Sequence, residues 1–354
     1  MSLFQRIPLF SLIFLIFFMC CLNARADDGI LLYTYFRDNG ESGTCLAYSE
    51  DGFDFKPLNQ DRPLLRPGKW PGQTLTRDTS MIYHNGLFHA VWTTNWAGPV
   101  FGYAESSDLV HWTAPVKVDV FKPDSYIPDT TWAPEIHWDS IKNNYLITVA
   151  SKGIVKPSSK LATQFSAFRG SNQSNYNIYV TRTKDGINFT EAALFFAIPF
   201  NVIDAQMVFS GNGQGVSAYR WIMVYKIEDA QGAGGKNLRY STAPADFSRP
   251  WSTPSPALVG PGSTVRPKEE AEGPCLIWWK NQWLLYWDAF NNGHYSVASS
   301  SDLEHWRDRT SELKTPPHPR HGTVFQISST AFQIVQKAIG DRATMLTVKP
   351  TQPN

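Results

Sequence analysis

The chain carries the nonapeptide AESSDLVHW at Ala104–Trp112, in which a turn rich in serine and aspartate runs into an aromatic residue. Related copies occur at AYSEDGFDF (Ala47–Phe55), TRTKDGINF (Thr181–Phe189), YSTAPADF (Tyr240–Phe247) and ASSSDLEHW (Ala298–Trp306). The copies are spaced at roughly 55–75 residues, a period typical of one supersecondary module that stacks on its neighbours to bury a core. Four strands in each of five modules predict an all-β fold, a five-bladed β-propeller.

Short alternating apolar runs, bounded by Gly, Asn, Asp or Pro, are typical of antiparallel hairpins. Four such hairpins are predicted, each followed by one copy of the repeat: Ser80–Trp92, Glu135–Ala150, Ala205–Lys226 and Pro274–Asp288. They define blades at Arg77–Val120, Trp132–Phe196, Asn201–Leu258 and Ala271–Arg309.

The fifth blade is predicted to be split between the two ends of the chain. Its innermost strand is expected at His321–Ile327 and its outer strands at Ile30–Phe36 and Thr44–Ser49. Pairing of N- and C-terminal segments closes the ring and leaves fewer exposed strand edges. Two stacked β-sandwich domains are the alternative, but no Pro/Ser-rich linker divides the chain.

The N-terminus resembles a secretory signal peptide. A basic-tipped start precedes the apolar run Ile7–Leu22, and Ala24-Arg25-Ala26 has the small-x-small pattern of a cleavage site. Residues 1–26 are therefore expected to be removed and the mature protein to be secreted or periplasmic; a membrane anchor and a lipoprotein through Cys20 or Cys21 are the alternatives. The propeller is expected over 27–330, and 331–354 as a tail packed on it or fraying from it, with a short helix around Ala331–Ala338.

Composition argues against several kinds of partner. The chain has 32 basic and 31 acidic residues and a net charge of +1, so no polybasic surface is available for nucleic acid or an anionic membrane. Only Cys45 and Cys275 follow the signal peptide, and two cysteines are not a disulfide framework. Two buried thiols are expected, and one disulfide is the alternative.

Ionisable residues stand at the predicted start of every innermost strand. The starts read Arg77-Asp78-Thr79-Ser80, Trp132-Ala133-Pro134-Glu135, Val202-Ile203-Asp204-Ala205, Ala271-Glu272-Gly273-Pro274 and Arg320-His321-Gly322-Thr323. Inner strands of a propeller run in the same direction, so four carboxylates at equivalent positions and one imidazole should meet at one end of the central channel. Such a cluster is costly for stability but suits acid/base chemistry. The alternative is that each acid only satisfies backbone groups of a turn.

The motifs Thr76–Met81, Trp132–Ile136, Val202–Ala205 and Ala271–Pro274 resemble those of glycoside hydrolase family 43 in order, spacing and blade position. The resemblance covers Gly29 to about Ile327. It implies a five-bladed propeller that removes arabinofuranosyl, xylosyl or related sugars with inversion. Thr79 and Ala205 depart from the family, in which Pro is frequent, and Glu135 stands where Asp is frequent.

The resemblance implies a role for each site residue. Asp78 would be the general base, Glu272 the general acid, and Asp204 the residue that orients the acid and tunes its pKa. Trp132 and Glu135 would line the sugar pocket. His321 would lie on the axis, where relatives hold a water cluster or a calcium ion, so that one structural calcium is the only cofactor considered.

Four further residues near the strand starts and in the split blade each have more than one possible role or a less specific one. Arg77 is expected to hold Asp78 ionised, to bind a sugar hydroxyl, or to lie on the surface; Arg320 is also expected at the substrate. Asp38 and Glu41 of the split blade are alternatives to Asp78 as the base, or solvated turn residues.

The positions of the acids support the same chemistry independently of the resemblance. Inverting hydrolysis needs an acid and a base separated by roughly 6.5–9.5 Å, and Asp78 and Glu272 belong to blades that are not neighbours. No cation is near Glu272 in the sequence, so partial burial is expected to raise its pKa.

These observations predict a secreted, inverting glycosidase of the α-L-arabinofuranosidase or β-xylosidase type, acting on plant-type oligosaccharides or polysaccharides, with terminal cleavage favoured. The alternatives are a non-catalytic carbohydrate-binding propeller and a β-fructosidase-like hydrolase, although no Asn-Asp-Pro segment is present. Nucleic acid, and a membrane after signal cleavage, are not expected as partners.

Overall fold

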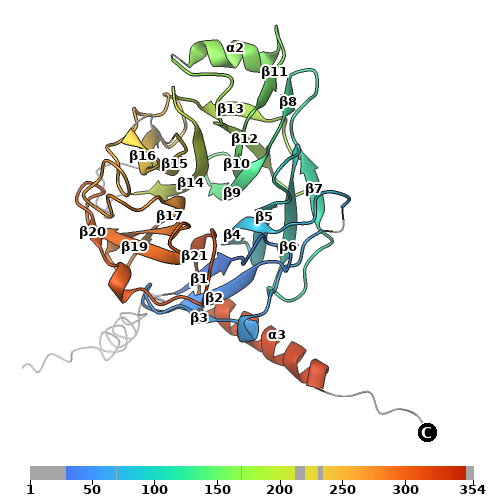
Figure 1. The fold of residues 1–354 in the computed structure, drawn as a ribbon. Helices are drawn as coiled ribbons and strands as arrows, with labels where there is room; N and C mark the ends of the chain where they lie inside the picture. The colour runs from blue at the N-terminus through green and yellow to red at the C-terminus, as the bar shows by residue number, and fades with distance from the viewer. Residues whose placement is uncertain (1–28, 69, 169, 212–219, 230–233, 348–354) are drawn as a thin grey trace, which may run out of the picture.

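The computed structural model describes residues 29–68, 70–168, 170–211, 220–229 and 234–347 (Figure 1). The predicted signal peptide lies outside these residues. Within them, none of the helices combines the length and the apolar character needed to cross a membrane.

The described strands form five blades around a central axis, as predicted (Figure 1). Blade 1 is β4 (Arg77–His84), β5 (Leu87–Thr93), β6 (Val100–Ser106) and β7 (Val116–Asp119). Blade 2 is β9 (Trp132–Asp139), β10 (Asn144–Ser151), β12 (Asn177–Thr183) and β13 (Ala193–Phe196). Blade 3 is β14 (Val202–Ser210), β15 (Arg220–Ile227) and β16 (Leu238–Pro244). Blade 4 is β17 (Glu272–Trp279), β18 (Gln282–Ala289), β19 (His294–Ser300) and β20 (Arg307–Asp308). Blade 5 is β21 (Val324–Ile327), β1 (Ile30–Tyr35), β2 (Cys45–Ser49) and β3 (Lys56–Pro57).

The ring closes through blade 5, which joins the two ends of the described chain. Strand β21 pairs with β1 in antiparallel register, with Leu32 opposite Phe325. The innermost strands β21, β4, β9, β14 and β17 contact one another in this order around the axis. The predicted split blade is therefore confirmed. Blade 3 departs from the prediction of four strands, since only an isolated bridge between Leu238 and Val259 extends its three described strands.

The repeats that predicted the fold are the turns at the end of the third strand of each blade. In blade 1 the Ser106 hydroxyl accepts the N–H of Leu109 at 2.8 Å, and Asp108 Oδ1 accepts the N–H groups of Val110 and His111 at 2.9 and 2.8 Å. Blade 4 repeats this arrangement around Ser300 and Asp302. Serine and aspartate recur because they satisfy the backbone groups of this turn.

Apolar side chains pack between neighbouring blades rather than in one central core. One cluster joins blades 1 and 2 through Phe101, Tyr103, Ile147 and Tyr179. Cys45 and Cys275 are buried free thiols in the cluster between blades 4 and 5, so the thiol interpretation is confirmed.

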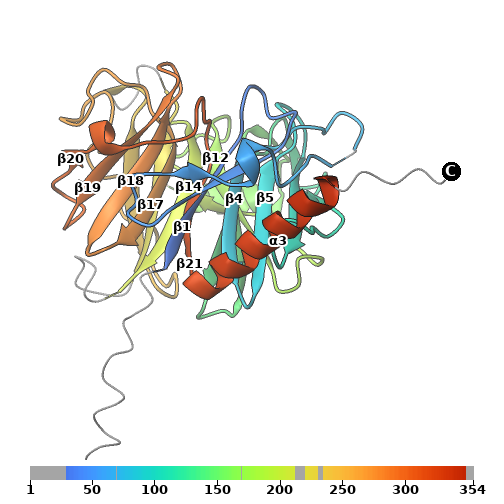
Figure 2. The same ribbon diagram turned by 90° about the horizontal axis from the view of Figure 1, so that it is seen from below.

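The remaining elements lie outside the blade sheets. A ribbon of β8 (Tyr126–Pro128) and β11 (Gly153–Val155), together with α2 (Lys160–Ala167), projects outward beyond blade 2 (Figure 1). Two 3₁₀ turns, η1 (Asn59–Asp61) and η3 (Thr310–Glu312), are part of the loops. Helix α3 (Ser329–Thr347) is longer than the predicted short helix and runs beside β1 and β4 (Figure 2).

Candidate active site

Four of the inner strands contain the same irregularity near their first residue. The pairing with the second strand shifts by one residue after Arg77, Trp132, Ile203 and Glu272. The next residue has a positive φ in each strand: Asp78 (51°), Ala133 (43°), Asp204 (55°) and Gly273 (55°). Each shift is a β-bulge, which re-aims the side chains that follow it.

The bulges arrange the inner-strand residues in three layers along the axis. The outer layer holds the residues before each bulge: Arg77, Trp132, Ile203, Glu272 and, in blade 5, Arg320. The middle layer holds Asp78, Ala133, Asp204, Gly273 and His321, and the inner layer holds Ser80, Glu135, Gln206, Cys275 and Thr323. The expectation that the four acids occupy equivalent positions is therefore wrong. Only Asp78 and Asp204 are equivalent, and Glu272 lies one layer nearer the opening.

The residues of the outer and middle layers, except Ala133 and Gly273, line a cavity of about 270 Å³ at one end of the channel, which we call the charged cavity. Its lining residues are Arg77, Asp78, Thr93, Trp96, Trp132, Ile203, Asp204, Lys226, Glu228, Glu272, Phe290, Arg320 and His321. The structure thus brings together Asp78, Asp204 and Glu272 with Arg77, Trp132, Arg320 and His321.

His321 forms the floor of the charged cavity. Its Nδ1 lies 3.5 Å from Asp78 Oδ1 and 4.0 Å from Asp204 Oδ2, and its Nε2 lies 3.9 Å from Glu135 Oε1. Burial disfavours a charged imidazole, but the charges of Asp204, Glu135 and Asp78 outweigh it and raise the pKa of His321 to about 10. His321 is therefore an imidazolium at neutral pH. Gly273 makes room for it, because a Cβ on this residue would lie 2.3 Å from His321 Cδ2.

Asp204 is 5% exposed and is held by the backbone of the neighbouring blade. Its Oδ2 accepts the N–H of Gly273 at 2.9 Å. Burial raises the pKa of Asp204 to about 6, even though His321 and Lys226 favour its charged form. This carboxyl therefore exchanges its proton near neutral pH, as a residue that assists acid/base chemistry must.

Glu272 is bound by two cations. Its Oε2 lies 3.1 Å from Lys226 Nζ, and its Oε1 lies 3.0 Å from Arg320 Nη2. Burial acts to raise the pKa of Glu272, but Lys226, His321 and Arg320 together hold this pKa below its ordinary value. The expectation that burial raises the pKa of Glu272 is therefore wrong, because Lys226 and Arg320 come from other blades and are not near it in the sequence.

Arg320 joins the floor of the cavity to its wall. Its Nε donates to Asp288 Oδ2 at 2.8 Å, and the same oxygen accepts the backbone N–H of His321 at 3.1 Å. Burial, with the repulsion of Glu272, raises the pKa of Asp288 to about 6.

Aromatic residues form the wall on the side of blades 1 and 2. Trp132 stacks on Tyr176 with ring centroids 5.1 Å apart, and meets Trp96 edge to face at 5.9 Å. The Arg77 guanidinium lies 4.1 Å from the centroid of Trp96 and donates to Asn39 at 3.0 Å. Arg77 is 7% exposed, which contradicts a surface role for this residue.

Three acids that the sequence placed at the pocket lie elsewhere. Asp38 and Glu41 are exposed and do not line the charged cavity, so the interpretation as turn residues holds. Glu135 is buried behind His321, where Thr323 Oγ1 donates to it at 3.3 Å, and it lines a second cavity in the channel instead. It lies one layer below the residues that line the charged cavity.

Sequence reasoning missed Lys226, Asp288, Trp96, Glu228 and Phe290. Lys226 and Asp288 are the next-to-last residues of the second strands of their blades, where Lys226 pairs with Ile203 and Asp288 pairs with Glu272. Antiparallel pairing places the end of a second strand beside the start of the first. The predicted hairpins ending at Lys226 and Asp288 therefore contained the information needed to find both residues.

The axial residues are a poor fit for calcium. Among the described residues, no group of three or more His, Cys, Asp or Glu is arranged to hold a metal ion. Calcium prefers oxygen ligands, whereas a protonated His321 presents N–H donors and a positive charge to Asp78, Asp204 and Glu135. The structural calcium stays a prediction, which metal analysis of the purified protein tests.

Comparison with solved structures identifies family 43 propellers with a similar fold. A thermostable family-43 glycoside hydrolase has a TM-score of 0.52 and 14% identity, over 70% of this chain and 78% of that one. An exo-β-1,3-galactanase from Phanerochaete chrysosporium, in the form of a point variant with β-1,3-galactotriose, has a TM-score of 0.50 and 12% identity. That alignment covers 69% of this chain and 52% of the galactanase chain.

Sequence comparison identifies the family. A search of curated proteins finds no match. The profile of a family related to glycoside hydrolase family 43, described as a probable glycosyl hydrolase domain, matches residues 29–332. This match spans all five blades and every residue of the charged cavity. The chain therefore belongs to this family of glycosyl hydrolases related to family 43.

Proposed function

We propose that the protein is an inverting glycosidase that cleaves a terminal sugar from an oligosaccharide or polysaccharide in the charged cavity. One observation carries this proposal. Asp78, Asp204 and Glu272 come from three different blades and line one cavity of about 270 Å³, with the imidazole of His321 on its floor. Two carboxyl groups on either side of a glycosidic bond are what the reaction needs.

Asp78 is proposed as the general base and Glu272 as the general acid. Asp78 lies in the middle layer against His321, where it would activate a water below the sugar. Glu272 lies one layer nearer the opening, where the leaving group departs. Inversion follows if the two carboxyl groups act in one step on opposite faces of the sugar.

The charge state of Glu272 must change when substrate binds. Lys226 and Arg320 favour its ionised form, whereas a general acid must carry a proton. A sugar that fills the cavity removes water from the carboxyl, and desolvation raises the pKa of an acid. Asp204, with a pKa of about 6, is the second candidate for the acid.

Leaving-group dependence distinguishes the two candidates. The acid variant should retain hydrolysis of 2,4-dinitrophenyl glycosides, whose leaving group needs no proton, and lose hydrolysis of unactivated alkyl glycosides. We expect this pattern for Glu272→Gln. For Asp78→Asn we expect a loss of activity on both kinds of glycoside, without rescue by azide. The same pattern in Asp204→Asn, with a uniform loss in Glu272→Gln, would move the acid role to Asp204. Near-normal rates of Glu272→Gln on alkyl glycosides would reject Glu272 as the acid.

The substrate is proposed to be an arabinofuranosyl or xylosyl glycoside of plant-type polymers. Secretion of the mature protein, through removal of residues 1–26, would give it access to such polymers. A panel of aryl α-L-arabinofuranosides, β-xylosides and β-galactosides tests the sugar, and NMR of the first product anomer tests inversion. The galactoside is included because one structural neighbour is an exo-β-1,3-galactanase. Binding without turnover across the panel would instead favour a non-catalytic carbohydrate-binding propeller.

A further inference from the structure

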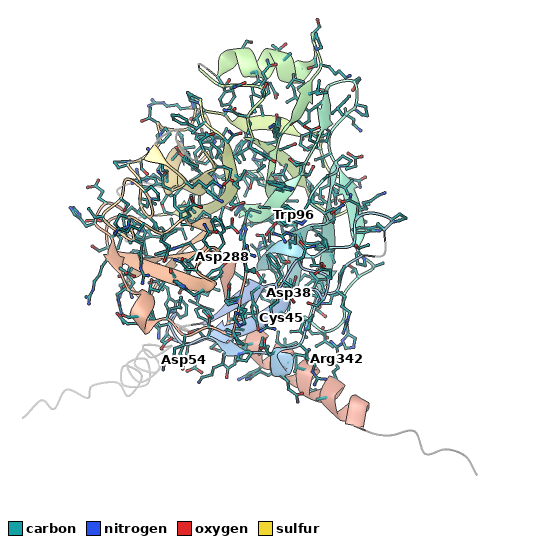
Figure 3. The ribbon with its side chains drawn as sticks, viewed as in Figure 1. Asp38, Cys45, Asp54, Trp96, Asp288 and Arg342 are labelled. Carbon is teal, nitrogen blue, oxygen red and sulfur yellow. The ribbon has the colours of Figure 1, made fainter. Side chains whose placement is uncertain are left out.

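Trp96 is exposed although it is a large apolar side chain at the charged cavity. It lies between β5 and β6 and is 52% exposed, whereas His321 on the floor is 3% exposed. In Figure 3, Trp96 lies toward the centre of the ring rather than at its outer edge. Trp96 therefore stands at the opening of the cavity, above the carboxyl groups.

The indole of Trp96 is held in one orientation. Its Nε1 donates to Asn39 Oδ1 at 2.8 Å, and the Arg77 guanidinium lies 4.1 Å from its ring centroid. Trp132 meets it edge to face and donates its own Nε1–H to the Trp96 carbonyl at 2.9 Å. These contacts fix the indole N–H and the orientation of the ring, while 52% of the residue stays exposed.

The loop that carries Trp96 is anchored on both sides. Asn95 Nδ2 donates to the Gly72 carbonyl at 2.6 Å, and Gln73 Nε2 donates to the Ala97 carbonyl at 3.1 Å. On the other side, the N–H of Gly98 donates to the Asp129 carbonyl at 2.9 Å. Single exposed apolar side chains are common on protein surfaces, but Trp96 lines the charged cavity on an anchored loop. A fixed aromatic ring at the edge of a cavity can offer its surface to a ligand.

We propose that Trp96 is the stacking platform for a second sugar ring, the one next to the sugar bound among Asp78, Asp204 and Glu272. The C–H groups on one face of a sugar ring pack well on an aromatic face, and a ring that is already fixed loses little entropy on binding. The inference rests on the proposed function for the identity of the buried sugar. It assigns the protein a preference for oligosaccharides over monosaccharide glycosides.

The kinetic test compares substrates that have one and two sugar rings. For the 4-nitrophenyl glycoside and the disaccharide of the sugar on which the aryl glycoside panel finds the highest activity, we measure kcat/KM of the wild type, Trp96→Ala and Trp96→Phe. We expect Trp96→Ala to lower the ratio of kcat/KM for the disaccharide to that for the aryl glycoside about tenfold, mainly through KM. Trp96→Phe keeps an aromatic face and should restore most of the ratio. Ile187→Ala, which trims a 73% exposed side chain outside the cavity, is the matched surface control.

A binding test separates this inference from the proposed function. In the Asp78→Asn background, calorimetry measures the affinity for mono-, di- and trisaccharides of xylose, arabinofuranose and β-1,3-linked galactose. A gain in affinity from one ring to two that disappears in Asp78→Asn/Trp96→Ala supports the platform even if the wild type hydrolyses nothing. An unchanged substrate ratio in Trp96→Ala, or a gain in affinity that survives the substitution, would overturn the platform while leaving glycosidase activity intact.

Discussion

At the scale of single residues, the β-bulge near the start of each of four inner strands decides which side chains meet. Asp78 and Asp204 adopt a positive φ there, a conformation that costs of order 1–3 kcal/mol in a non-glycine residue and that aspartate tolerates better than most. Gly273 fills the same position in blade 4 and leaves space for His321. The bulges therefore set the depth at which each acid faces the cavity.

Gly273→Ala should move His321 and impair the site. The new Cβ would lie 2.3 Å from His321 Cδ2 on a backbone with φ of +55°. We expect a loss of about 1–3 kcal/mol in the free energy of unfolding, measured in urea, and a large loss of kcat/KM. Gly293→Ala is the control, because φ is +69° there but no atom lies within 4 Å of the added Cβ. Equal losses of activity in both variants would refute the contact with His321 as the cause.

Lys226→Met should change the pH dependence of activity. The ammonium of Lys226 favours the charged form of Glu272, so its removal raises the pKa of this carboxyl. If Glu272 is the acid, it then stays protonated to higher pH, and the basic limb of the kcat/KM profile moves to higher pH by roughly one unit.

Lys236→Met is the matched control for Lys226→Met. Lys236 binds Glu228 at 2.9 Å, as Lys226 does at 2.7 Å, but it makes no ion pair with Glu272. We expect its profile to follow that of the wild type. A basic limb that stays in place in Lys226→Met would argue against Glu272 as the acid.

At the scale of elements, α3 covers the seam between blade 5 and blade 1 (Figure 2). Ala331, Phe332 and Val335 are buried there, and the Phe332 ring lies 4.8 Å from that of Tyr48. The helix begins two residues after the closing strand β21 ends. The same segment of chain thus closes the ring and seals its outside.

Phe332→Ala should destabilise the propeller by about 3–5 kcal/mol, the usual cost of truncating a buried phenylalanine. Ile334→Ala on the same helix should change stability by about 0.5 kcal/mol or less, because Ile334 is 49% exposed. Thermal and urea unfolding measure both variants. Similar stabilities of the two variants would show that α3 contributes little to the ring.

At the scale of the whole molecule, charges from all five blades meet on one axis. Asp78, Glu135, Asp204 and Glu272 come from blades 1 to 4, and His321 comes from blade 5. Each charge alone would be costly to bury, and their mutual attraction offsets part of that cost. His321 belongs to blade 5, which closes the ring, and its positive charge faces acids of blades 1 to 3. The same charge therefore contributes to the site and to the contacts that hold the ring closed.

Stability should fall as pH rises from 7 to 10. The pKa of His321 is about 10 in the folded protein and 6.5 ordinarily, so its contribution is fully present below about pH 6.5 and is lost as pH rises through about 10. The raised pKa of Asp204, about 6, changes the stability mainly below pH 7. It therefore does not contribute to the slope between pH 7 and 10. Urea unfolding of the wild type and His321→Gln across this range tests the effect. A slope that is equally steep in His321→Gln would exclude His321 as its source.

Short-range patterns in the chain were enough to predict the blades and their order. The serine- and aspartate-rich turns, the hairpins and the strand starts are local features, because a turn or a strand needs only its own residues and the alternation of apolar positions. Asp78, Asp204, Glu272 and His321 were found because inner strands begin at one end of the axis. The split blade followed from the same counting of strands.

The contacts that give these residues their chemistry depend on the assembled ring. Glu135 stands two residues after the bulged position of its strand and Glu272 one residue before it, whereas Asp78 and Asp204 occupy that position. The place of each bulge is set by pairing with the second strand. Lys226 and Arg320 are 46 and 48 residues away from Glu272 along the chain. Trp96 contacts Asn39 and Trp132, which are also distant from it in the sequence. Charge and burial at a point depend on every segment that converges there, so tertiary packing decided the pKa shifts of Asp204 and Glu272. The strands themselves follow from neighbouring residues.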